Sequence, residues 1–201
     1  FFPFTGAVHE NVETSVNLAW SQKGMGDAEY VVAFERVIIP IMTEFDPDLV
    51  LVSAGFDAAT GDQLGGMHVT PSVYGFMTHV LCTRFQRVGL VLEGGYSLSM
   101  LSACSLECVR SLLGKFEKKT SRRYFIQESA FKDICSAIKV QQTQPRGIRL
   151  NMLKSSSKDL CVLSNPVLFT CSGVVWNEDT STEVRICSVR DAMPSNVCAL
   201  V

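Results

Sequence analysis

Two short loops carry the side chains of this 201-residue chain that are best suited to chemistry. Each follows an apolar run: Asp57 comes after residues 49–53, and Tyr96 comes after residues 88–92. Glycines in both loops let the backbone turn sharply and approach a ligand closely. Asp57 can ligate a metal or orient a base, and Tyr96 can donate a hydrogen bond to a developing oxyanion. The alternative is structural: Asp57 caps a turn, and Tyr96 packs over the edge of a sheet.

Parallel strands and helices are needed to position these loops. The runs 49–53 and 88–92 are short, β-branched and apolar on both faces, which is typical of buried parallel strands. Apolar residues at helical spacing predict helices over 28–45, 71–85, 98–113 and 128–140. We expect Asp27 to cap the first helix and Pro40 to kink it. The alternating order predicts an α/β fold, a parallel sheet with flanking helices, in which ligands bind outside the carboxyl ends of the strands.

Composition excludes several functional classes. Eighteen basic and twenty acidic residues give a net charge of −2, so the chain lacks the surplus of basic residues that would indicate binding to nucleic acid. No apolar run approaches the roughly 18 to 20 residues that span a bilayer. Eight cysteines are too few for a disulfide scaffold and favour a reducing compartment. Cys104 and Cys108 share a helix face; they are a metal or redox pair, or two small buried side chains, and we favour the second interpretation.

The segments around both loops resemble the zinc-dependent histone deacetylase family. The similarity is carried by SAGFDAA at 53–59, GDQLGG at 61–66 and LEGGYSL at 92–98, in the family's order and spacing. It extends over roughly residues 1–142 and is nearest to class IIb, the tubulin-deacetylase-like members. The resemblance implies the arginase/deacetylase-like version of the α/β fold.

The resemblance also implies roles for single residues. Asp57 matches an aspartate zinc ligand, and Tyr96 matches the tyrosine that hydrogen-bonds the acetyl carbonyl oxygen. Phe2 matches one aromatic wall of the acetyl-lysine tunnel. Leu64 matches the leucine at the tunnel rim, and Gly94 lies beside the tunnel floor. Class IIa vertebrate members carry histidine where Tyr96 stands, so the tyrosine favours the active branch.

Two family motifs have no counterpart in the chain. One is a His-His pair that acts on the attacking water, and the other is an Asp-x-His pair that supplies the remaining two zinc ligands. We therefore expect residues 1–145 to be the C-terminal part of a deacetylase catalytic domain, with a sheet incomplete at its N-terminal side. Residues 146–201 match no motif and are expected to be linker plus short strands, with weak alternation over 162–176.

The function that the resemblance implies is zinc-dependent hydrolysis of N6-acetyl-lysine in histone tails or tubulin. The implied cofactor is Zn²⁺, and the implied partners are acetylated proteins and co-repressors, without nucleic acid or membrane, in the nucleus or the cytoplasm. Because catalytic zinc needs three protein ligands and Asp57 is one, we expect the chain alone to be inactive. The alternative is a catalytically inactive, deacetylase-like interaction module. Leu64 favours a protein substrate, since a polyamine-preferring class IIb branch carries glutamate at that position.

Overall fold

The computed structural model describes residues 6–11, 15–117, 125–143, 185–188 and 197–200, the last two ranges as backbone. Its strands are β1 (Ser15–Asn17), β2 (Leu49–Ala54), β3 (Val88–Leu92), β4 (Arg185–Ser188) and β5 (Val197–Leu200). Its helices are η1 (Val8–Glu10), α1 (Asp27–Ala33), η2 (Phe34–Ile38), α2 (Ile39–Phe45), α3 (Pro71–Arg84), α4 (Leu98–Leu112) and α5 (Glu128–Thr143). Among the described residues, no helix is long and apolar enough to cross a membrane.

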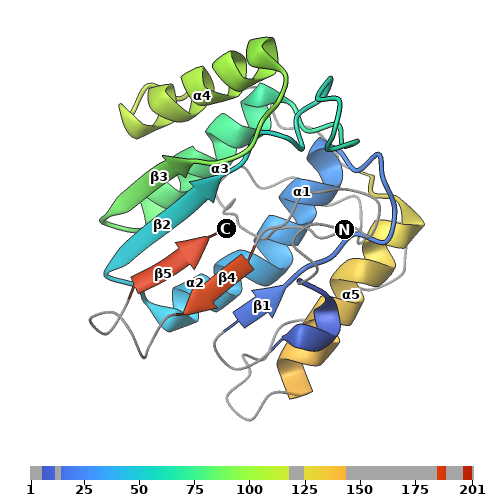
Figure 1. Cartoon of the computed structure of the whole chain (residues 1–201). Helices are drawn as coiled ribbons and strands as arrows, with labels where there is room; N and C mark the ends of the chain where they lie inside the picture. The colour runs from blue at the N-terminus through green and yellow to red at the C-terminus, as the bar shows by residue number, and fades with distance from the viewer. Residues whose placement is uncertain (1–5, 12–14, 118–124, 144–184, 189–196, 201) are drawn as a thin grey trace.

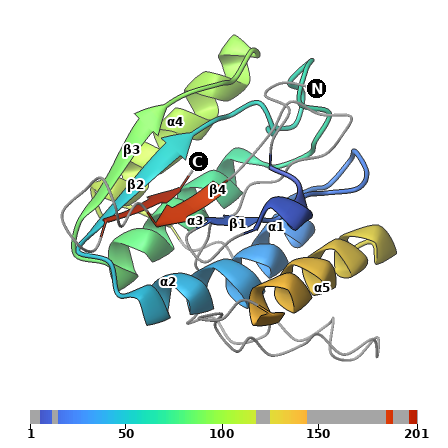
Figure 2. The same cartoon turned by 60° about the horizontal axis from the view of Figure 1, so that its bottom comes forward.

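The five strands form one sheet in the order β1-β4-β5-β2-β3. β2 pairs in parallel with both β3 and β5, whereas β4 pairs antiparallel with β1 and β5. Helices α1, α2 and α3 lie on the same face of the sheet (Figures 1 and 2). The predicted α/β class, with parallel strands and flanking helices, is confirmed. β4 and β5 lie within residues 146–201, where short strands were expected but not placed at these positions, and the strands expected at 162–176 lie outside the described residues.

The prediction that both parallel strands are buried on both faces is wrong. Val50 and Ala54 of β2 are buried, but Val91 of β3 is 53% exposed and Leu92 is 57% exposed. The reason is the position of β3, which forms an edge of the sheet among the described strands and packs only part of its length against the helices.

The first helix begins one residue earlier than predicted. Gly26 is its N-cap, and the Glu29 carboxylate accepts a hydrogen bond from the Gly26 N–H at 2.9 Å. The prediction that Asp27 caps the helix is therefore wrong. The Asp27 carboxylate instead accepts hydrogen bonds from the Thr70 backbone N–H at 2.7 Å and from its hydroxyl at 2.9 Å, which ties α1 to the start of α3.

Pro40 distorts the helix without ending it. Proline lacks an N–H donor and its ring collides with the carbonyl four residues earlier. The chain meets this requirement with the π-helical turn η2 immediately before α2, and Pro40 then occupies the first turn of α2. A widened turn is a recognised way to accommodate such a residue.

Helices α3 and α4 pack closely because small residues meet between them. A Cβ atom added at Gly75 would lie 2.9 Å from the Glu107 Cβ, and the Ser111 hydroxyl donates to the Gly75 carbonyl at 2.6 Å. Cys104 and Cys108 are buried and free, as the favoured interpretation predicted. Burial raises the pKa of Cys104 to about 12 and that of Cys108 to about 11, so both thiols stay protonated at neutral pH.

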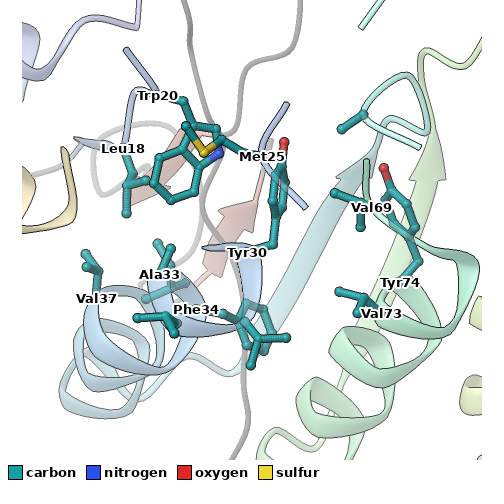
Figure 3. Close-up of a cluster of buried hydrophobic side chains, with 14 of the residues drawn as sticks. Leu18, Trp20, Met25, Tyr30, Ala33, Phe34, Val37, Val69, Val73 and Tyr74 are labelled. Carbon is teal, nitrogen blue, oxygen red and sulfur yellow. The ribbon is translucent and has the colours of Figure 1, made fainter. Parts of the chain in front are cut away.

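A continuous apolar core supports the carboxyl ends of the parallel strands. Figure 3 shows Tyr30 and Phe34 on the side toward α3, which contributes Val73 and Tyr74, and Trp20 beside Met25. The ring centroids of Trp20 and Tyr30 are 5.9 Å apart. Burial raises the pKa values of Tyr30 and Tyr74, with smaller contributions from neighbouring groups that include Asp57, so both phenols remain neutral at neutral pH.

Candidate active site

The two candidate loops are joined by backbone hydrogen bonds that continue the β2–β3 pairing beyond the strands. The Glu93 N–H donates to the Ala54 carbonyl at 3.1 Å, and the Phe56 N–H donates to the Gly94 carbonyl at 2.9 Å. Because parallel strands end at the same edge of a sheet, this pairing brings the residue after Phe56 beside Gly94. Asp57 is that residue.

The Asp57 carboxylate lies against two glycines, and a side chain at either position would make an unusually close contact with it. A Cβ atom at Gly94 would lie 3.0 Å from Asp57 Oδ2, and one at Gly55 would lie 3.1 Å from Oδ1. A third glycine packs against the backbone of the same residue, since a Cβ at Gly65 would lie 1.8 Å from the Asp57 carbonyl oxygen. Glycines at these positions therefore allow both loops to close around one carboxylate.

Burial makes Asp57 an unusual carboxylate. The residue is 7% exposed, and desolvation raises its pKa, with a smaller contribution from the Asp62 charge. Hydrogen bonds from the backbone N–H groups of Asp57 and Ala58 offset part of this rise. No ion pair within the described residues involves Asp57. A buried carboxylate of this kind is stabilised in its charged form by a cation.

Asp57 alone could supply one of the protein ligands of a zinc ion. Carboxylate oxygen is an accepted zinc donor, and catalytic zinc takes three protein ligands. Among the described residues, no group of three His, Cys, Asp or Glu side chains could hold a metal ion. His9 and His68 are exposed within that part of the chain, and His79 stacks on Phe116. A zinc site that includes Asp57 would therefore need its other donors from outside the described residues.

Leu64 and Tyr96 lie on the two loops beside Asp57, and both side chains reach solvent. Leu64 is 56% exposed and Tyr96 is 59% exposed. Their backbones converge on one side chain, because the N–H groups of both residues donate to the carboxylate of Asp62. Phe2, expected to form a wall of the substrate tunnel, lies outside the described residues.

Asp62 is the site-forming residue whose importance the sequence did not reveal. An aspartate directly after a glycine is typical of a turn, and a turn does form: Oδ1 accepts from the N–H groups of Leu64 at 2.9 Å and Gly65 at 3.1 Å. The local sequence could not predict the other two hydrogen bonds of Asp62, because their donors lie more than thirty residues away along the chain. Oδ2 accepts from Tyr96 at 2.7 Å and from Ser97 at 3.1 Å.

Comparison with known proteins identifies the family. The histone deacetylase domain model matches residues 1–112. Histone deacetylase HDA1 of Candida albicans is 40% identical over 136 residues, which is 67% of this chain and 16% of that protein. Human polyamine deacetylase HDAC10 is 45% identical over 124 residues, which is 61% of this chain and 18% of that protein. The chain thus spans less than a fifth of the length of either relative.

The fold agrees with this match. The solved structure of the histone deacetylase Clr3 superposes with a TM-score of 0.62 at 41% identity, covering 66% of this chain and 22% of the other. The match to the family model includes both loops, with Asp57 and Tyr96, and the strands that carry them. The chain belongs to the histone deacetylase domain family.

Proposed function

We propose that this chain contributes to a zinc-dependent protein lysine deacetylase that hydrolyses N6-acetyl-lysine in histone tails or tubulin. The observation that carries the proposal is the Asp57 carboxylate, which is buried, lacks an ion-pair partner among the described residues and sits at the carboxyl ends of two parallel strands. Membership of the deacetylase family supports the same chemistry. The nucleus and the cytoplasm are the proposed locations, with co-repressors as further partners.

The proposed deacetylase unit extends beyond the matched residues to about residue 145. Helix α5 supports this limit because it is tied to the N-terminal region at two points. The Ser21 N–H and hydroxyl donate to Asp133 Oδ2 at 2.8 and 3.0 Å, and the Gln127 N–H donates to Glu29 Oε1 at 3.0 Å. Ile134 of the same helix is fully buried in the common core.

Three residues of this chain have proposed roles in the reaction. Asp57 holds the metal with donors from outside the described residues, and zinc, when bound, acts as a Lewis acid and activates water. The Tyr96 hydroxyl donates a hydrogen bond to the oxygen of the scissile amide as negative charge develops on it. Leu64 lies at the rim, where its exposed apolar side chain contacts the substrate.

Replacing the carboxylate tests the metal assignment. In the zinc-loaded deacetylase that includes this chain, Asp57→Asn should lose zinc and activity together, because the amide keeps the shape but not the charge. Zinc content by mass spectrometry and release of acetate are the readouts. Asp133→Asn is the matched control, since that carboxylate bonds Ser21 at the far helix α5. An Asp57→Asn enzyme with full zinc and normal turnover would reduce Asp57 to a turn residue. A wild-type protein that holds no zinc and releases no acetate would instead favour the inactive interaction module.

Leu64 bears on the substrate class, since the matched relatives include both histone deacetylases and a polyamine deacetylase. A carboxylate at the rim attracts a cationic amine: at about 4 Å and an effective dielectric near 20, two unit charges attract by about 4 kcal/mol before desolvation. Leucine carries no charge to attract the amine, and its apolar side chain is compatible with contacts to a peptide substrate. We expect kcat/KM to favour an acetyl-lysine peptide over acetylspermidine, and Leu64→Glu to shift the ratio toward the polyamine. A wild-type preference for acetylspermidine would overturn the assignment of a protein substrate.

A further inference from the structure

The Asp62 side chain connects two parts of the candidate site that are distant in the sequence. It is 9% exposed and accepts four backbone hydrogen bonds, two on each oxygen. The Oδ1 donors belong to the loop that carries Leu64, and the Oδ2 donors belong to the loop that carries Tyr96. One rigid carboxylate thus fixes the spacing between these two loops.

Tyr96 needs such an anchor because its surroundings constrain it weakly. Its side chain is 59% exposed, and it follows two consecutive glycines, of which Gly95 has a φ of +129° that L residues rarely adopt. Glycine is the most flexible residue of the backbone. Helix α4 begins only at Leu98, and its N-cap Ser97 makes no side-chain capping bond. The bonds from the Tyr96 and Ser97 N–H groups to Asp62 tie this turn to the loop that carries Leu64. They add to the Phe56 N–H bond to the Gly94 carbonyl and the Leu101 N–H bond to the Ser97 carbonyl.

The negative charge of Asp62 strengthens the four hydrogen bonds that hold the two loops together. Burial opposes its ionisation, yet the hydrogen bonds from Leu64, Tyr96, Gly65 and Ser97 outweigh burial and lower the pKa of the carboxyl. Hydrogen bonds from N–H groups to an ionised carboxylate are about twice as strong as neutral ones. An amide at this position would turn an NH₂ group toward one pair of N–H donors and lose those bonds.

We infer that Asp62 is a positioning residue of the deacetylase site, which holds the Tyr96 hydroxyl donor in register with the substrate rim at Leu64. The inference rests on the proposed function, since it gives Asp62 its role through Tyr96. Asp62 itself touches neither metal nor substrate in this scheme; its effect is on the placement of the turn that carries the tyrosine.

The test is a double-mutant cycle in the zinc-loaded deacetylase that includes this chain, with Asp62→Asn and Tyr96→Phe alone and combined. Asp62→Asn should retain zinc and lower kcat by about 10- to 100-fold, part of the roughly 10²–10³-fold effect of one oxyanion donor. In the Tyr96→Phe background the same change should lower kcat by less than about 3-fold, because the group that it positions is already gone. Asp62→Glu, which retains the charge, should recover part of kcat.

Glu29→Gln is the matched control for lost packing. Glu29 is also a buried carboxylate with two backbone N–H donors, from Gly26 and Gln127, but none of them belongs to the site loops. It should lower the thermal midpoint without changing kcat. An equal loss of kcat from Asp62→Asn in both backgrounds, or loss of zinc, would overturn the inference. If Asp62→Asn does not fold, Asp62→Glu in both backgrounds gives the same decision. Failure of Tyr96→Phe alone to reduce kcat would instead contradict the proposed function.

Discussion

Asp57 and Asp62 are both buried carboxylates of one loop, and their surroundings move their pKa values in opposite directions. Burial raises the pKa of Asp57, which has few backbone donors. Asp62 is also shielded from solvent, but four N–H groups stabilise its charge and lower its pKa. Asp62 is therefore satisfied by the protein alone, whereas Asp57 gains from a cation. In the proposed function, Asp57 is the metal-binding carboxylate and Asp62 is the structural one.

Tyr96→Phe removes one hydroxyl from the proposed site. In the zinc-loaded deacetylase we expect zinc to remain and kcat to fall by about 10²–10³-fold, the effect of one oxyanion donor. KM should change little, because the hydrogen bond strengthens mainly as charge develops in the transition state. Steady-state kinetics on an acetyl-lysine peptide measure both constants.

Leu98→Ala is the control for this prediction. Leu98 is also highly exposed and begins the helix that follows the Tyr96 turn. It should leave kcat unchanged. An unchanged kcat in Tyr96→Phe would remove Tyr96 from the mechanism and leave it as a residue of the sheet edge.

At the scale of elements, the π-helical turn η2 gives the α1–α2 helix a pH-sensitive residue. Burial raises the pKa of Glu35 to about 8, although the neighbouring Arg36 lowers it in part. The folded state therefore binds a proton that the unfolded chain releases near the ordinary glutamate pKa of about 4.3. The contribution of Glu35 to stability is full below that value and is lost as the pH rises through about 8.

Glu35→Gln should flatten this pH dependence. We expect the urea midpoint of the wild-type chain to fall as the pH rises from about 5 to about 9, and the midpoint of the variant to fall less, because glutamine has no charge to bury. Glu44→Gln, an exposed residue of α2, is the control and should keep the wild-type slope. Identical slopes in all three proteins would mean that Glu35 ionises freely in the fold.

Local sequence pattern predicted the main elements but not their surroundings. The runs at 49–53 and 88–92 form β2 and β3, and the four predicted helices form with ends shifted by a few residues. Burial on both faces was wrong for Val91, because exposure depends on which strand lies at an edge. Asp27 has the local features of a helix cap, yet it bonds Thr70, a partner that only the folded chain brings near.

In the candidate site, too, the local sequence predicted the position of residues but not their surroundings in the fold. Asp57 and Tyr96 follow predicted strands, so their loops could be placed at one end of a sheet, and their roles came from the resemblance to deacetylases. The four-donor environment of Asp62 could not be predicted, since two of its hydrogen bonds cross more than thirty residues. The steric need for Gly94 likewise appears only when both loops surround Asp57.

For the whole molecule, the number of metal donors sets what this chain can do by itself. In the proposed function Asp57 supplies one zinc ligand, and the described residues contain no group of three His, Cys, Asp or Glu side chains that could hold a metal ion. We expect the purified 201-residue chain to retain less than one equivalent of zinc after dialysis and to release no acetate from an acetyl-lysine peptide. Metal analysis and the acetate assay measure this. Tight one-to-one zinc that disappears in Asp57→Asn would show that the remaining donors lie within these 201 residues.

The exposed edge at β3 also has a consequence for handling and storage of the chain. Val91 and Leu92 are exposed on β3, one of the two edge strands of the described sheet, and Leu106 and Val109 add exposed apolar surface on α4. An uncovered strand edge offers free N–H and C=O groups to any other extended chain, and apolar side chains on it promote adhesion. Concentrated solutions of the isolated chain should therefore form intermolecular β-sheet with time. A lysine at position 91 should delay the rise in light scattering, since charge on an edge strand opposes such pairing.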